Sequence, residues 1–322
     1  MTFEAYLRSR GASEGALATG TVWTRAMLGQ DPKDISALYF LNYCKSGGGL
    51  MQMRSDRKHG GQYLRVRQGT QLLAKGLHSS LPANTVRLSQ PVEAIIQDPR
   101  AEKVSVKTSG ILYTARKVIT TLPGTALQSI SFFPRLPLSK QLWLDSLTYG
   151  YYTKAMMEFK SPFWVNAGFC GLINSFTGPA SVVRDTSSPA DGKHVLTCFM
   201  GADFGRAWSA LTTKKEKEDA LLAQLEKLYG QNNLKEQFAS LTFYEWTDDP
   251  WSGWGCPCTA LSPGVLDTVG PDGLRESVGN LHFAGTETAG EWKGYMEGAV
   301  RSGERAAAEV IGSLRGGIVS RL

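Results

Sequence analysis

The sequence predicts a protein of mixed class, α+β or α/β, with more than one domain. Three observations support this class: helical stretches open the chain, short β-branched or alternating runs follow over residues 86–121, and a strand, a glycine turn and a long helix lie near its end. With 322 residues, of which 42% are hydrophobic and 20% charged, the chain can bury a sizeable core and form roughly two to three domains.

The elements can be assigned in order along the chain. Residues 3–28 and 34–45 read as helical stretches separated by the breaker Asp31-Pro32, and Gly47-Gly48-Gly49 marks a turn. A further helix is expected over residues 69–81. The expected strands are Val86–Leu88, Pro91–Gln97, Lys103–Lys107, Ile111–Ala115, Val118–Thr121, Thr153–Phe159, His194–Met200, Leu241–Trp246 and Asn280–Ala284.

The segment Thr213–Tyr229 gives the clearest helix signal. Thr213 and Glu216 form a candidate capping box, leucines recur on one face, and Gly230 follows the last turn. The helix expected at Trp292–Ser313 is rich in small residues, which permit close packing on a sheet. We expect the first of these helices to be structural.

Charge and hydropathy exclude several classes. The net charge of +6 is modest, and the short basic cluster at residues 54–59 lacks the aromatic interleaving of a nucleic-acid site, so we read it as a solvated loop. No run of about 18 apolar residues predicts a membrane span, and the first ten residues lack the apolar core of a signal peptide. We therefore expect no nucleic-acid partner, no membrane span and no secretion.

The five cysteines are an odd number at irregular spacing, which argues against a disulfide framework and favours a reducing compartment. Cys256-Pro257-Cys258 has no second Cys or His pair within reach in the sequence, so no metal site is expected.

Residues 281–305 carry the strongest functional signal. They read as a strand, a glycine-containing turn and a helix, and Gly285 and Gly294 allow backbone to approach a flat ligand. The free N–H groups at the start of the helix favour an anion or an electron-rich cofactor edge. By spacing alone, a common strand-turn-helix packing unit explains the segment equally well.

The residues themselves closely resemble the C-terminal flavin motif of the flavin-containing monoamine oxidase family: Gly285-Thr286-Glu287-Thr288, then Trp292, then Gly294-Tyr295-Met296-Glu297-Gly298-Ala299. The resemblance implies that Glu287 lies by the ribityl and pyrophosphate part of FAD and that Met296 offers a backbone N–H to the flavin. Tyr295 would form one wall of an aromatic cage for the amine. The cofactor-binding residues implied in this segment are Gly285, Thr286, Glu287, Trp292, Gly294 and Met296.

The resemblance extends over nearly the whole chain. His59-Gly60-Gly61-Gln62 is similar to the loop that gives a substrate-binding Gln, which implicates Gln62. Gln90-Pro91-Val92 is similar to the strand whose Val binds adenine through its backbone, which implicates Val92. Lys154, before Pro162-Phe163-Trp164, matches the family's catalytic Lys, which holds a water against flavin N5. An exposed strand lysine is the alternative, and we favour the catalytic role, shared with Tyr295.

Cys256 falls where some family members join a cysteine to the flavin 8α carbon through a thioether. Such a bond needs a thiolate at close range, and Gly253-Trp254-Gly255 would allow the approach. A buried, unreacted thiol over non-covalent FAD is an equally strong alternative, because many relatives have one.

Two departures from the family pattern concern the substrate. Pro257 stands where the second cage tyrosine is expected, and Trp254 could replace that wall. Arg54 and Ser55 stand where members have apolar gate residues, which suggests a more polar entrance. The resemblance therefore does not imply a simple arylalkylamine as the substrate.

The larger departure is the missing N-terminal G-x-G-x-x-G unit, which binds the FAD pyrophosphate in this family. Residues 11–20 have the wrong glycine spacing, and the match begins well into the family's sequence. The implied fold is an incomplete FAD-binding Rossmann-like domain interleaved with a mixed-sheet substrate domain. Its segments would be 1–66 (substrate), 67–143 (FAD), 144–249 (substrate), 250–314 (FAD) and a tail at 315–322.

The resemblance implies an FAD-dependent oxidase that converts a primary or secondary amine to an imine and aldehyde, with oxygen as co-substrate and hydrogen peroxide as product. It allows a homodimer. Two alternatives stay open: a truncated, non-catalytic relative that binds no FAD by itself, and an L-amino-acid oxidase, for which no carboxylate-binding Arg can be assigned from sequence. Ser320-Arg321-Leu322 is a conservative variant of the Ser-Lys-Leu peroxisomal address, so we expect peroxisomal localisation.

Overall fold

The computed structural model describes residues 1–98, 103–270 and 272–315. The chain folds into two compact units, each made from two stretches of sequence: unit 1 is Met1–Phe40 with Ser146–Leu266, and unit 2 is Leu41–Asp145 with Asp267–Leu322. Their segments alternate along the chain. This division into compact units does not show which segments bind FAD and which bind substrate. The predicted four segments and tail therefore stay a prediction.

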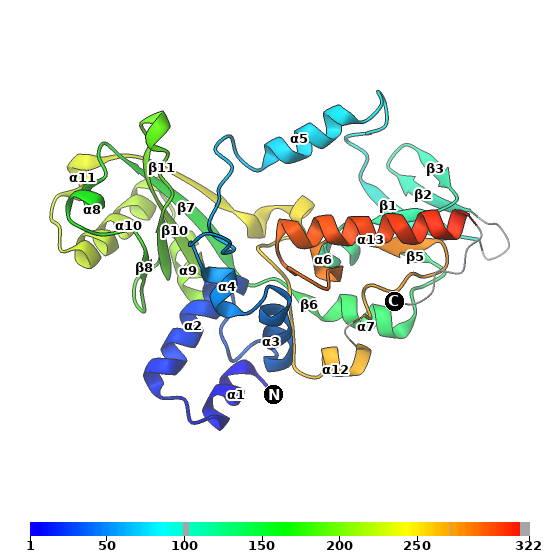
Figure 1. Cartoon of the computed structure of the whole chain (residues 1–322), viewed down its shortest axis with the longest axis horizontal. Helices are drawn as coiled ribbons and strands as arrows, with labels where there is room; N and C mark the ends of the chain where they lie inside the picture. The colour runs from blue at the N-terminus through cyan, green and yellow to red at the C-terminus, as the bar shows by residue number, and fades with distance from the viewer. Residues whose placement is uncertain (99–102, 271, 316–322) are drawn as a thin grey trace. The chain divides into compact units, whose positions relative to one another are not determined.

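An antiparallel sheet with strand order β11-β7-β10-β9-β8 forms the centre of unit 1 (Figure 1). Its strands are β7 (Tyr152–Phe159), β8 (Ile173–Asn174), β9 (Val182–Asp185), β10 (His194–Gly201) and β11 (Phe238–Glu245). β7 is an interior strand, since it pairs with β10 on one side and β11 on the other. The predicted strands 153–159, 194–200 and 241–246 are confirmed, with β11 beginning three residues earlier than expected.

One face of this sheet is covered by the apolar core of unit 1. Alternate residues of β7 and β10, such as Met157 and Cys198, point into it because successive side chains of a strand face opposite ways. The core is completed by Trp208 of α9 (Ala202–Ser209) and by Leu221 of α10 (Lys214–Tyr229). The short helices α8 (Phe163–Asn166) and α11 (Leu234–Gln237) belong to the same unit.

Helix α10 has the predicted caps. The Thr213 hydroxyl accepts a hydrogen bond from the Glu216 N–H at 3.1 Å, and the Glu216 carboxylate accepts one from the Thr213 N–H at 2.9 Å. Gly230 ends the helix in the left-handed conformation. Both ends are therefore specified locally, as the sequence indicates.

The N-terminal part of unit 1 is helical. The stretch expected at residues 3–28 is two helices, α1 (Phe3–Ser9) and α2 (Glu14–Leu28). Gly11 interrupts them with φ of 77°, and the Ser13 hydroxyl caps the second. Helix α3 (Ala37–Ser46) begins in unit 1, which also contains the pair β6 (Leu147–Thr148) and β12 (Ala260–Leu261).

Unit 2 contains two sheets. The first has the order β3-β2-β1-β5 and is mixed, because β1 pairs antiparallel with β2 and parallel with β5. The second is the parallel pair β4 and β13. The strands are β1 (Val92–Gln97), β2 (Val104–Thr108), β3 (Leu112–Ala115), β4 (Val118–Thr120), β5 (Ser131–Phe133) and β13 (Leu281–Phe283).

The helices of unit 2 are mostly short, apart from the last. They are α4 (Leu50–Arg54), α5 (Gln71–Ser80), α6 (Gly124–Leu127), α7 (Leu138–Ser146), α12 (Val265–Val269), a 3-10 turn at Thr286–Thr288 and α13 (Met296–Leu314). Helix α13 packs on β13 and on the 3-10 turn, and its small residues Gly298, Ser302 and Ala306 are buried. The close approach predicted for this helix is confirmed at Ser302 and Ala306, whereas Ala299 is exposed.

Two sequence predictions about secondary structure are wrong. Val86–Leu88 forms no strand: a turn at Asn84 precedes it, and its side chains are exposed. Helix α13 begins at residue 296 rather than 292, because Trp292 and Gly294 have φ of 55° and 82°, which a right-handed helix excludes.

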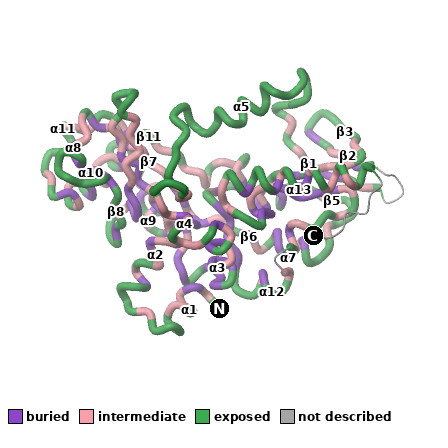
Figure 2. Tube along the Cα trace, in the orientation of Figure 1, coloured by how far each residue is buried: buried purple, intermediate pink, exposed green. Residues whose placement is uncertain are grey.

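Helix α5 and its flanks stand out in Figure 2 as an exposed stretch, although they are rich in leucine. Leu72 and Leu77 are 47% and 69% exposed. Within the described part of the chain, no helix is both long enough and apolar enough to cross a bilayer.

Candidate functional site

The segment between β13 and α13 is shaped by glycine and by one threonine. Gly285 has φ of 101°, and a Cβ there would lie 3.1 Å from the carbonyl oxygen of Thr121. The Thr286 hydroxyl accepts a hydrogen bond from the Gly294 N–H at 2.7 Å and donates one to the Tyr295 carbonyl at 2.9 Å. This hydroxyl therefore closes the loop just before the helix begins.

The N-terminus of α13 is open to a ligand. Its N-cap residue, Tyr295, makes no side-chain cap hydrogen bond, and Met296, the first helical residue, is 53% exposed. The first N–H groups of a helix have no partner within the helix and carry the positive end of its dipole. In a helix of 19 residues, this end suits an anion or an electron-rich ring edge.

Glu287 is buried beside this loop. Its Oε2 accepts a hydrogen bond from the Gly124 N–H, the start of α6, at 2.7 Å. Two more polar groups of the same unit, the hydroxyls of Thr120 and Thr125, are buried with no hydrogen-bond partner among the described residues. Buried hydroxyls are normally hydrogen-bonded, so these orphans suit a polar ligand in the neighbourhood of α6.

An aromatic group surrounds Tyr295. Its ring is stacked with that of Tyr43 of α3, with centroids 6.5 Å apart, and meets Trp292 edge-on at 5.4 Å. The N–H of Trp292 donates to the Ser46 carbonyl at 2.8 Å, which ties the loop to the end of α3. Tyr295 is thus held by contacts with two aromatic rings, and its role as a cage wall stays a prediction.

Gln62 lies close to the same aromatic group. A Cβ on its neighbour Gly61 would come within 3.3 Å of the Trp292 ring. The side chain of Gln62 donates to the Met53 carbonyl at 3.1 Å, which fixes its amide. Val92 lies at the start of β1, opposite Thr108.

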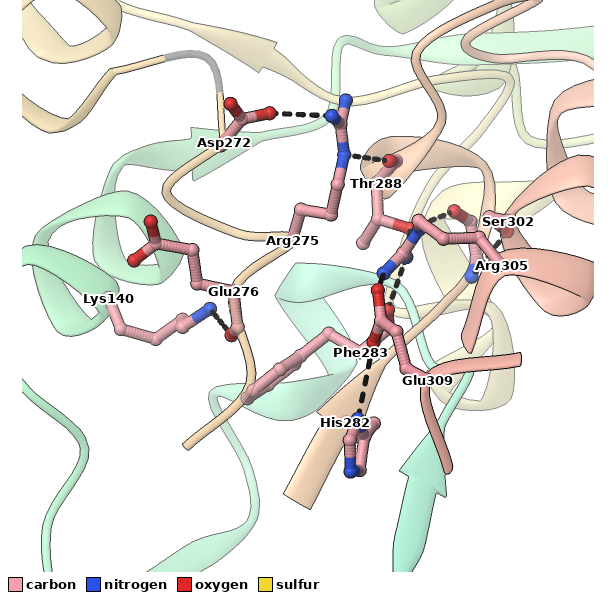
Figure 3. Close-up of polar contacts among 11 residues, drawn as sticks. Lys140, Asp272, Arg275, Glu276, His282, Phe283, Thr288, Ser302, Arg305 and Glu309 are labelled. Carbon is pink, nitrogen blue, oxygen red and sulfur yellow. Dashed lines mark hydrogen bonds and ion pairs between the residues drawn. The ribbon is translucent and has the colours of Figure 1, made fainter. Parts of the chain in front are cut away.

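A network of charged groups fixes the strand and the loop to α13 (Figure 3). Arg305 donates to the Phe283 carbonyl at 2.6 Å and to the Thr288 hydroxyl at 3.1 Å, and it pairs with Glu309 at 2.7 Å. His282 Nδ1 lies 3.2 Å from the other oxygen of Glu309. The loop that holds Glu287 is therefore braced from the helix behind it.

Lys140 of α7 is a buried cation of unit 2 (Figure 3). Its Nζ donates to the Glu276 carbonyl at 2.5 Å and lies 4.1 Å from the centroid of the Phe283 ring. Burial lowers the pKa of Lys140 to about 8. The contacts brace β13 from the side opposite His282, so its role here is structural.

Lys154 lies on the interior strand β7 of unit 1, half-buried between two aromatic residues. In register it faces Phe199 on β10 and Tyr244 on β11, and its Nζ lies 5.6 Å from the centroid of the Phe199 ring. It is on the sheet face opposite the apolar core, which includes its neighbour Ala155. The inward, apolar setting expected for this residue is thus only partly right: the setting is aromatic and half-open.

Cys256 belongs to the same unit. Burial raises the pKa of its thiol to about 12, and the positive charge of Lys154 opposes this shift. The preceding Gly255 lies flat against Tyr149, because a Cβ at Gly255 would come within 2.2 Å of that ring. Trp254 is 50% exposed with φ of 60°, so its ring is available as a wall.

Apart from Val92, the predicted residues therefore fall into two groups. Unit 2 brings Gln62 together with the Gly285–Met296 segment, and unit 1 brings Lys154 together with Cys256. Sequence reasoning missed Tyr43, Phe199, Tyr244, Thr120 and Thr125. Strand register would have indicated Phe199 and Tyr244, but the hydroxyls of Thr120 and Thr125 carry no sequence signal.

A glycine loop before a helix N-terminus, with a buried carboxylate beside it, suits a cofactor that has an anionic or electron-rich edge. Residues 9–311 match the family of flavin containing amine oxidoreductases, and the chain belongs to that family. The family implies a flavin cofactor, FAD, and the polar groups around Glu287 and the start of α13 fit such a ligand.

Curated relatives match along most of this chain. Amine oxidase [flavin-containing] A of Bos taurus is 34% identical over 88% of the chain and 53% of its own length. A putative flavin-containing monoamine oxidase, AofH, of Mycobacterium tuberculosis strain H37Rv is 34% identical over 96% of the chain and 64% of its own length. The chain thus spans about half to two thirds of these relatives.

Solved structures agree with the fold. Cyclohexylamine oxidase from Brevibacterium oxydans IH-35A superposes with a TM-score of 0.88 at 29% identity, over 98% of this chain and 68% of its own. Putrescine oxidase bound to putrescine gives a TM-score of 0.86 at 24% identity, over 97% of this chain and 68% of its own, and shows the fold alone.

Proposed function

We propose that this chain belongs to an FAD-dependent amine oxidase that converts a primary or secondary amine to an imine, which water hydrolyses to an aldehyde. The observation that carries the proposal is the cradle in unit 2: a helix N-terminus without a side-chain cap, Gly285 pressed against Thr121, and the buried Glu287 carboxylate. The names of the relatives support amine oxidation in general.

FAD, when bound, takes up the two electrons of the amine's α C–H bond and passes them to oxygen, which gives hydrogen peroxide. The residues of this chain bind and orient. The N–H of Met296 would hold the ring edge, and Glu287 would face the ribityl end. Val92 would contact adenine through its backbone.

On the substrate side, Tyr295 and Gln62 would position the amine. Lys154 would hold a water against flavin N5, beside its cross-strand aromatic neighbours Phe199 and Tyr244. As a finer form of the proposal, Cys256 joins the flavin through a thioether, and the protein acts as a homodimer.

The test is to express the chain, add FAD and record the visible absorbance of the purified protein, then add an amine without oxygen. We expect a yellow protein that bleaches with amine. Lys154→Met should slow bleaching without loss of colour, whereas Lys160→Met, on a residue whose Nζ contacts the Glu236 carbonyl, should change neither. A preparation that stays colourless with added FAD would support a non-catalytic relative instead.

We also propose import into peroxisomes through Ser320-Arg321-Leu322, which lie outside the described residues. The motif supports this, and the confinement of peroxide in that compartment fits an oxidase. Deleting the three residues from a fluorescently tagged chain should move it to the cytosol. Unchanged import after the deletion would contradict the proposal.

A further inference from the structure

The sheet of unit 1 has one face that its core does not cover, and Lys154 stands on it. We define the Lys154 face by the alternate residues that share it in register. They are Lys154 and Met156 of β7, Val182 and Arg184 of β9, Thr197 and Phe199 of β10, and Thr242 and Tyr244 of β11. The opposite face carries the buried core residues between them, such as Met157 and Val183.

Arg184 is the second cation on this face. It lies directly opposite Thr197, which in turn lies opposite Met156, one step along the strand from Lys154. The hydroxyls of Thr186 and Thr197 are hydrogen-bonded at 2.6 Å, and Thr186 is two residues beyond Arg184, so strand alternation puts Arg184 on the same face. Arg184 is half-buried, so its positive charge is only partly screened by water.

No carboxylate of the described residues pairs with either cation. The neighbouring Asp185 points to the other face, where it accepts a hydrogen bond from Trp164 Nε1 at 2.9 Å. Glu158, which shares the Lys154 face, is engaged by Lys193 at 2.6 Å and by the Ser240 hydroxyl. The Lys154 face therefore carries a local excess of positive charge.

An excess of positive charge on a partly desolvated face repels the cationic form of a simple amine and attracts an anion. A guanidinium with five N–H donors in a planar fork matches a carboxylate in two-point contact. We propose that Arg184 binds the carboxylate of an amine substrate, and so sets specificity. This inference rests on the proposed amine oxidase function.

The separation of Lys154 and Arg184 on the sheet also bears on where the substrate's carboxylate lies relative to its amine. Lys154 and Arg184 are separated by two strand spacings of about 4.8 Å and one two-residue step of about 6.6 Å, which gives about 12 Å between their Cα atoms. If both side chains stand upright on the sheet, their charged ends are separated by a similar distance, and a substrate that meets both has several bonds between its amine and its carboxylate. The favoured class is an ω-amino carboxylate, rather than an α-amino acid.

The test compares two probes of equal chain length, 6-aminohexanoate and hexylamine, by ligand-observed NMR titration of the whole chain. Arg184→Gln should weaken binding of 6-aminohexanoate by about 10- to 100-fold, because a charge-assisted hydrogen-bond pair is lost. Hexylamine binding should change less than about twofold. Arg184→Lys should give an intermediate loss, since lysine keeps the charge without the fork.

Arg206→Gln is the matched control. Arg206 is an exposed arginine of α9 in the same unit, paired with Asp203 at 2.9 Å, so this variant removes one positive charge away from the Lys154 face. It should leave binding of both probes unchanged. Circular dichroism of each variant establishes that the fold is intact.

Three results would overturn the inference: no binding of 6-aminohexanoate by the wild-type chain, equal losses for both probes in Arg184→Gln, or the same loss in Arg206→Gln. Failure of the amine oxidase proposal is seen separately, since flavin bleaching by hexylamine does not need Arg184. Suppose that Arg184→Gln selectively loses 6-aminohexanoate binding while the flavin of the wild-type chain is never bleached by an amine. This result would support the carboxylate site and contradict the oxidase function.

Discussion

The Glu287 carboxylate accepts a hydrogen bond from the backbone N–H of Gly124 at 2.7 Å, across 163 positions of sequence. This contact ties the loop before α13 to the first residue of α6. Because Glu287 is buried, its loss leaves a buried N–H without this acceptor.

Glu287→Leu should therefore lower the free energy of unfolding by about 1–3 kcal/mol. Glu287→Gln keeps an amide oxygen as acceptor and should cost less than about half as much. Urea unfolding of both variants measures the difference. Equal losses would mean that the negative charge, rather than the hydrogen bond, holds the loop.

Two glycines of α13 offer a matched pair. A Cβ at Gly298 would lie 2.3 Å from the carbonyl oxygen of Trp292, whereas a Cβ at Gly303 meets nothing within 4 Å. Gly298→Ala should push the helix away from the loop that carries Tyr295 and cost more than about 2 kcal/mol. Gly303→Ala should stabilise the chain by up to about 1 kcal/mol, since alanine is the better helix former.

Thermal unfolding of the two variants checks this prediction. Similar changes in thermal stability for the two variants would show that the loop can move to accommodate a Cβ at residue 298. Gly298 would then not fix the distance between the helix and the loop.

The contrast between these glycines also shows how far sequence reasoning reaches. The C-terminal motif, the strands β7 and β10 and the caps of α10 follow from local signals, because capping and alternation act within a few residues. The start of α13 does not: the left-handed turn at Trp292 is set by contacts with α3, which are distant in sequence. Arg184 was missed for the same reason, because only strand register puts it on the face of Lys154.

The thiol of Cys256 should react slowly. Burial raises its pKa to about 12, so only a minute fraction is thiolate at neutral pH, and the thiolate is the reacting form. Alkylation by iodoacetamide, followed by mass spectrometry of the Cys256 peptide, should speed up about tenfold per pH unit between pH 7 and pH 9. Exposed Cys170 serves as the internal reference and should react faster throughout.

Lys154→Met should slow alkylation of Cys256 further, because the lysine charge lowers the pKa of the thiol. If the flavin is attached at this residue, its incorporation should follow the same pH dependence. Release of all flavin on denaturing a yellow preparation would rule out the thioether.

Lys140 should give the chain a pH-dependent stability at alkaline pH. Burial lowers its pKa from 10.5 to about 8, so between these values the folded chain holds this lysine neutral while the unfolded chain still binds the proton. Stability rises with pH wherever the unfolded state binds more protons. The unfavourable contribution of Lys140 is thus complete below pH 8 and is relieved as the pH rises toward 10.5.

Lys140→Met removes this titration and also the hydrogen bond to the Glu276 carbonyl. The free energy of unfolding of the wild type, minus that of the variant, should therefore increase from pH 7.5 to pH 10, by at most about 3 kcal/mol. Lys160→Met, at the exposed Lys160, is the control and should give a flat difference. A flat difference for Lys140→Met as well would show that the Lys140 ammonium stays charged in the fold, held by the Phe283 ring and the Glu276 carbonyl.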